Sequence, residues 1–223
     1  MSYFTPDFLI FFQDLAANNN RDWFHANKKR YEKSVREPFK SFVQVLIDAA
    51  SEYNADISQI VPKQAIFRIH RDIRFSKDKT PYKIQSTAII SPYGRSKMDA
   101  PSGFYLEITP EHFRIYGGMY MVSKDDLVKV RRAIVEKPEE FKKRYSETEF
   151  VKYFGEIQGE KNKRIPKEFK PHIETEALIA NKQFYYFTEF DLDLLFDESV
   201  INTIMQRYQI MDKMSAFFRK AIE

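Results

Sequence analysis

Hydrophobic side chains in the first third of the chain recur every three or four positions, the spacing of one face of a helix. One stripe contains Phe8, Phe11, Phe12 and Leu15, and a second contains Phe39, Phe42, Val43, Leu46, Ile47 and Ala50. The run Asn18-Asn19-Asn20 is expected to end the first helix, because asparagine favours turns. A further helix is expected to begin at Asn20 or Arg21. Residues 1–60 are therefore predicted to be helical.

The middle of the chain changes to short runs of β-branched and aromatic residues, separated by Pro, Gly, Ser and Asp. These runs predict strands near residues 66–70, 84–90, 103–109 and 113–118, and a similar run predicts a returning strand at 184–190. The connection Thr-Pro-Glu-His between the third and fourth runs suits an antiparallel hairpin. Residues 61–122 are therefore predicted to form a β-meander.

Helical spacing returns after residue 123, with helices expected over 124–136, from Pro138, and over the apolar stripe that runs from Ile201 to Phe218. Residues 123–223 are predicted to be helical with one returning strand. The whole chain, 1–223, is predicted to be a single α+β domain, in which a mainly antiparallel sheet is covered by N- and C-terminal helices.

The composition narrows the class of protein. The 223 residues include no Cys, which excludes a disulfide scaffold and a thiol nucleophile. The longest apolar stretches are only a few residues long, so no membrane partner is expected. The N-terminus lacks a basic and apolar leader pattern, and a cytoplasmic location is expected.

Motifs for cofactors and metals are missing from the sequence. Neither a G-x-x-x-x-G-K-[ST] loop nor a G-x-G-x-x-G turn occurs, and the four His residues are scattered along the chain. We therefore assign no cofactor and no metal. No catalytic residue emerges, and whether the chain is an enzyme is left open.

Charge is concentrated in one short segment, Arg68 to Lys83. It holds six Lys or Arg residues against two Asp, a local charge of +4 that equals the formal net charge of the whole chain. Pro81 prevents these side chains from being spread along a helix. Basic charge confined to one segment favours an anionic partner that binds at that segment over non-specific binding of a polyanion across the whole surface.

Three blocks of sequence carry a family resemblance. They are NNNRDWFHANKKRYEKSVREPF from Asn18, IFRIHRDIRFSKDKTPYK from Ile66 and GFYLEITPEHFRIYGGMY from Gly103. Together they resemble a family of bacterial and fungal proteins known only as a domain of unknown function. The resemblance extends over nearly the whole chain and implies a complete single-domain member. The resemblance implies no catalytic residue, because no activity is assigned to the family.

Polar and amphipathic positions within these blocks are the candidate ligand-binding residues, since a purely structural pattern would favour apolar ones. They are Trp23, Asn27, Arg71, Arg74, Lys79, Tyr82, Lys83 and Tyr120. We expect them to converge on one cleft between the N-terminal helices and the meander. The expected ligand is small and anionic or phosphorylated, and the 68–83 segment is expected to bind it.

Two other functions stay open. Phe67, Phe75 and Tyr82 flank the basic segment and could stack on a single strand of nucleic acid, although a net charge of +4 is modest for that role. A protein-interaction module is the third class. A structural alternative is that Arg71 and Arg74 pair with Asp72, Asp78 or C-terminal acids and merely brace the fold.

Overall fold

The computed structural model describes residues 2–223, and the chain separates into two compact units. The first holds the chain up to Ser96 with Tyr105–Ile115 and Glu189–Met205; the second holds Lys97–Phe104, Tyr116–Thr188 and Gln206–Glu223. Whether the chain acts as a single domain stays a prediction. Each unit is described by itself.

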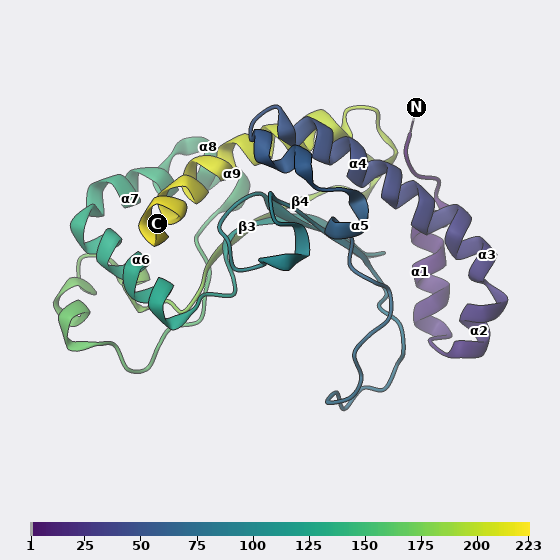
Figure 1. The fold of residues 1–223 in the computed structure, drawn as a ribbon, viewed down its shortest axis with the longest axis horizontal. Coiled ribbons are helices and arrows are strands. Elements are labelled where there is room, and N and C mark those ends of the chain that lie inside the picture. The colour runs from purple at the N-terminus through teal and green to yellow at the C-terminus, as the bar shows by residue number, and fades with distance from the viewer. Residues whose placement is uncertain (1) are drawn as a thin grey trace. The chain divides into compact units, whose positions relative to one another are not determined.

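The predicted α+β class is confirmed, with helices at both termini and an antiparallel sheet of four strands in residues 2–223 (Figure 1). The strands are β1 (Ser86–Ile90), β2 (Phe104–Ile108), β3 (Phe113–Met119) and β4 (Phe184–Phe190). Their order in the sheet is β1-β2-β3-β4, so each strand lies beside the next one in the chain. The predicted hairpin and the returning strand at 184–190 are both confirmed.

The strand predicted at residues 66–70 is wrong. Ile66 forms an isolated bridge with Ala88 of β1, whereas His70 forms one with Tyr82. The segment thus changes its partner within four residues. A strand needs consecutive pairings with one neighbour, and this change of partner prevents them.

Helices of the first unit are α1 (Asp7–Ala17), α2 (Arg21–Ala26), α3 (Lys28–Tyr31), α4 (Glu37–Ser51) and α5 (Pro62–Ala65), with a π-helical turn at Glu32–Arg36 before α4. The side chain of Asn20 accepts a hydrogen bond from the backbone of Trp23 at 2.9 Å and so caps α2. Both predicted apolar stripes are buried, and α4 contacts β1. This packing forms the core of the unit.

The second unit contains α6 (Lys124–Glu136), α7 (Pro138–Ser146), α8 (Thr148–Phe154) and most of α9 (Val200–Ile222). The buried hydroxyl of Tyr186 in β4 donates to the carbonyl of Met211 in α9 at 2.9 Å. Strand β4 is therefore joined to the closing helix by a hydrogen bond as well as by apolar packing. Within residues 2–223, every helix is too short or too polar to cross a lipid bilayer.

Candidate functional site

The basic segment lies in a long loop between α5 and β1, which extends away from the sheet in Figure 1. Two backbone hydrogen bonds close its base: the Arg71 amide donates to the Pro81 carbonyl at 2.9 Å, and the Lys83 amide donates to the Ile69 carbonyl at 2.8 Å. The loop is therefore closed like a hairpin. Residues 72–80 form its tip.

The base of the loop is attached to the N-terminal helices. The side-chain nitrogen of Asn19 donates to the Tyr82 carbonyl at 2.9 Å, and the Tyr82 amide donates to Asn19 Oδ1 at 3.1 Å. The buried Tyr82 ring also stacks on Phe24 of α2, with 4.1 Å between ring centroids. These contacts hold the loop against α2.

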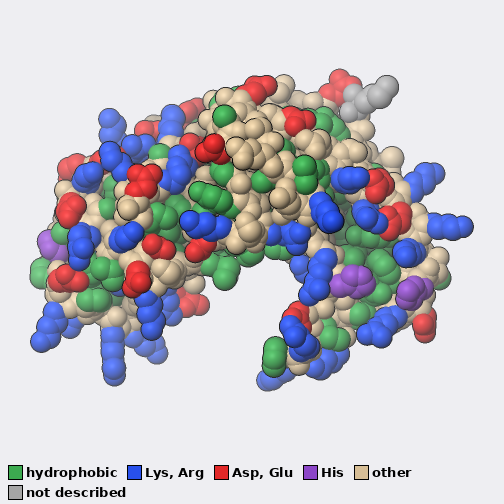
Figure 2. Space-filling model, viewed as in Figure 1, with side chains coloured by type: hydrophobic (Ala, Val, Ile, Leu, Met, Phe, Trp, Pro, Cys, Tyr) green, Lys and Arg blue, Asp and Glu red, His purple; other side chains and the backbone are tan. Residues whose placement is uncertain are grey.

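A groove of about 410 Å³ lies where α2 meets the loop. We call it the basic groove, and the residues that line it are Arg21, Phe24, His25, Lys28, His70, Arg71, Ile73, Pro81 and Tyr82. Five of them are basic, and no carboxylate lines the groove. Figure 2 shows His, Lys and Arg side chains gathered around a hydrophobic patch in this part of the surface. This arrangement favours an anionic ligand.

Free positive charge in the basic groove comes mainly from α2 and α3. In the described part of the chain, Arg21 and Lys28 have no carboxylate partner in an ion pair. Arg71, by contrast, contacts the Asp78 carboxylate and the Thr80 hydroxyl. Arg21 and Lys28 are therefore the stronger candidates for ligand contact.

Arg74 and Lys79, two of the predicted ligand-binding residues, make contacts inside the loop tip. The Arg74 guanidinium donates to both oxygens of Asp72, at 2.9 and 2.6 Å, and the Lys79 ammonium donates to the Ile73 carbonyl at 2.9 Å. The hydrogen bond from the Arg74 side chain is the main reason why the pKa of Asp72 is lowered to about 2. The internal pairs of Arg71 with Asp78 and Arg74 with Asp72, considered as a structural alternative, are both present.

Trp23 and Asn27 have structural contacts in the first unit. The Trp23 ring lies 5.6 Å from the Phe11 ring, and the Asn27 side chain donates to the Trp23 carbonyl at 3.0 Å at the end of α2. Tyr120 belongs to the second unit, where its ring contacts Tyr185. None of these three is among the residues that line the basic groove.

Lys83 lies at a second hollow of about 530 Å³. Asp72 and Asp78 line this hollow too, so it carries both signs of charge. The Lys83 ammonium lies 5.4 Å from the centre of the Phe67 ring. Partial burial lowers the pKa of Lys83, and the nearby Arg68 and Arg95 lower it further. Of the eight predicted residues, the structure brings Arg71 and Tyr82 to the basic groove and Arg71, Tyr82 and Lys83 to this second hollow.

Sequence reasoning missed four basic residues of the groove, Arg21, His25, Lys28 and His70. A signal was present for the first three, since positions 21, 25 and 28 are separated by four and three residues, as on one helical face. No such signal marks His70. It reaches the groove because its backbone pairs with that of Tyr82.

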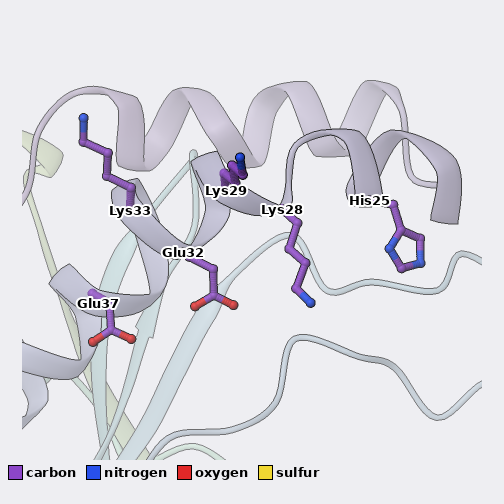
Figure 3. A pocket seen from close by; sticks show the side chains of 6 residues that line it. All are labelled: His25, Lys28, Lys29, Glu32, Lys33 and Glu37. Carbon is purple, nitrogen blue, oxygen red and sulfur yellow. The ribbon is translucent and has the colours of Figure 1, made fainter.

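A third hollow, drawn in Figure 3, provides a contrast to the basic groove. It measures about 550 Å³, and its lining consists of His25, Lys28, Lys29, Glu32, Lys33 and Glu37. In Figure 3 the side chains of Lys28, Glu32 and Glu37 project to one side and that of Lys33 projects to the other. Two carboxylates among its charges make it a poor anion site. Within residues 2–223, no cluster of three or more His, Asp or Glu side chains could hold a metal ion.

The fold and the groove define an α+β protein in which a basic loop and the N-terminal helices form a cationic surface. Residues 7–217 match a family model described as Conserved hypothetical protein (DUF2461), and the chain belongs to this family. The predicted family of unknown function is thereby confirmed. No curated protein and no solved structure matches the chain.

Proposed function

We propose that this protein binds a small anionic, phosphorylated ligand in the basic groove. The observation that carries the proposal is a lining with five basic side chains and no carboxylate. A cytoplasmic location is part of the proposal, because a chain without Cys suits a reducing compartment.

The chemistry of the lining suits an oxyanion. Arg21 offers a planar fork that can bind two oxygens at once, and Lys28 offers a compact point charge. His25 and His70 add ring N–H donors, and they add positive charge when protonated. The apolar edge made by Phe24 and Tyr82 reduces competition from water, which strengthens these charge-assisted hydrogen bonds.

The test is a titration of the full chain with inorganic phosphate, pyrophosphate and nucleoside mono- and triphosphates at constant ionic strength. Binding is measured by calorimetry and by the rise in melting temperature that a ligand of the folded state produces. Arg21→Gln and Lys28→Gln are each expected to weaken binding by roughly ten- to a hundredfold, since a hydrogen bond to a charged group contributes about 1.5–3 kcal/mol. The melting temperature without ligand should stay the same.

Lys33→Gln is the matched control. It removes the same charge from the same helical region, but Lys33 does not line the basic groove. It is expected to leave binding unchanged. Equal losses in Lys28→Gln and Lys33→Gln would show a general charge effect and overturn the proposal, as would the lack of binding to every probe.

A further inference from the structure

The tip of the basic loop displays an aromatic side chain in water. Of the large hydrophobic side chains in residues 2–223, Phe75 is the most exposed at 95%, and the next is Tyr120 at 65%. A phenylalanine so exposed adds little to the packing of the fold. Its ring is available to a partner that covers aromatic surface.

Hydrogen bonds inside the tip fix the backbone on both sides of Phe75. The Arg74 amide and side chain both bond to Asp72, and the Thr80 amide donates to Asp78 at 2.9 Å. Lys79 joins the two halves of the tip through its bond to the Ile73 carbonyl. A tip that is ordered before binding loses little conformational entropy when a partner binds, so contact with the Phe75 ring needs only a small entropy loss.

Basic residues flank Phe75 in the sequence, with Arg74 directly before it and Lys77 two positions after it. The Arg74 guanidinium lies 5.8 Å from the centre of the Phe75 ring. In the described part of the chain, Arg68 and Lys77 have no carboxylate partner in an ion pair. The tip therefore combines one aromatic face with one cation outside any ion pair, Lys77, and Arg68 adds another just before the base of the loop. Aromatic faces and cations together are the groups with which proteins bind the bases and phosphates of single-stranded nucleic acids.

The tip is continuous with the basic groove. Ile73 lines the groove and lies two residues before Phe75, so their backbones are at most about 7 Å apart. This distance corresponds to about two nucleotides of a stacked nucleic-acid strand, in which the rise is about 3.4 Å per nucleotide. One strand can therefore reach both places.

We infer that the basic groove also accepts the phosphates of a single-stranded nucleic acid, one base of which stacks on Phe75. This inference rests on the proposed function, because the same groove binds the phosphate groups, and it extends the ligands of the groove to a polymer. Stacking suits every base, so binding is expected to depend little on sequence. A membrane surface is less favoured, because Arg74, Ser76 and Lys77 beside Phe75 are polar and one ring offers little apolar area.

The experiment measures binding of the full chain to fluorescently labelled 12-nucleotide single-stranded RNA and DNA by anisotropy, at two salt concentrations. Affinity is expected to fall as salt rises. Phe75→Ala should weaken oligonucleotide binding about tenfold, and Phe75→Trp should retain it because the stacking face is kept. Phe75→Ala should leave binding of inorganic phosphate and the melting temperature unchanged. Tyr53→Ala, which truncates another exposed aromatic side chain, is the control and should bind like the parent.

The outcomes separate the two ideas. If Phe75→Ala binds oligonucleotides like the parent while Lys28→Gln still weakens phosphate binding, the inference of nucleic-acid binding (the strand inference) is overturned and the proposed function stands. If neither phosphate nor oligonucleotides bind, the proposed function fails and the strand inference fails with it. Binding to phosphatidylserine vesicles that requires Phe75, with no binding to oligonucleotides, would also overturn the strand inference.

Discussion

The side-chain amide of Asn19 pairs with the backbone of Tyr82 as a neighbouring strand would, through one donated and one accepted hydrogen bond of 2.9 and 3.1 Å. The two residues are 63 positions apart. Asn19 lies between α1 and α2, and Tyr82 lies at the base of the basic loop. This pair therefore ties the N-terminal helices to the segment that carries the local positive charge.

Replacing Asn19 with Ala should lower the free energy of unfolding by about 1–3 kcal/mol, since two partly buried hydrogen bonds are lost. Asn19→Asp should also destabilise the protein, because a carboxylate cannot donate to the Tyr82 carbonyl. Urea unfolding measures both effects. Asn18→Ala is the control, because the exposed side chain of Asn18 donates to the nearby Asp14 carbonyl and, among the described residues, to no other partner. Equal losses in Asn18→Ala and Asn19→Ala would contradict the tie between helices and loop.

Two glycines with positive φ should respond differently to Ala. Gly118 has φ +88°, and an added Cβ would lie 2.1 Å from the Phe184 carbonyl oxygen; Gly155 has φ +66° with no atom within 4 Å of such a Cβ. Gly155→Ala should cost about 1–3 kcal/mol from backbone strain alone, because φ +66° with ψ −116° is a backbone conformation that residues other than glycine rarely adopt. Gly118→Ala should cost clearly more, because the backbone of β4 must move as well. The fall in melting temperature of each variant measures its loss of stability. A similar fall in both would show that the close contact between residue 118 and the backbone of β4 adds nothing to the loss.

The carboxylates of the loop tip should titrate at unusually low pH. Hydrogen bonds lower the pKa of Asp72 and of Asp78 to about 2, from a usual value of 3.8; Arg74 is the main cause for Asp72, and the Thr80 amide is the main cause for Asp78. Because the pKa values of these two carboxylates are lower in the folded state than in the unfolded state, their hydrogen bonds stabilise the folded state above about pH 4. That contribution is lost as the pH falls through about 2.

Carbon-13 NMR of the side-chain carboxyls measures these midpoints directly. Arg74→Gln should return the midpoint of Asp72 towards 3.8 and leave that of Asp78 near 2. Midpoints near 3.8 in the parent protein would contradict the contacts that order the tip.

Removal of the buried Tyr186 hydroxyl should weaken the second unit. This hydroxyl bonds to the Met211 carbonyl and to Ser215, at 2.9 and 3.0 Å. Tyr186→Phe is expected to lower the free energy of unfolding by about 1–2 kcal/mol, because buried partners are left without a hydrogen bond. Tyr185→Phe, in the same strand, should change stability by less than about 0.5 kcal/mol, as surface changes usually do. Thermal unfolding of both variants tests this, and the expectation fails if the two lose the same stability.

Much of the fold could be predicted because its signals are local. The stripe from Phe39 to Ala50 and the alternation in β2 arise from the helical and strand periods themselves, so both elements were located within a few residues. The segment 66–70 could not be predicted in this way. Its β-branched residues favour a strand, but the partner changes from Ala88 to Tyr82 along it.

The sequence by itself determined the α+β class, the family and the place of the local charge of +4. Only the tertiary structure decided which cations are free to bind a ligand. Arg74 and Lys79 are bonded within the tip, while Arg21 and Lys28 line a groove that no carboxylate shares. The physical reason is that a charge is available only where no opposite charge lies within about 4 Å, and such distances depend on the folding of residues far apart in the sequence.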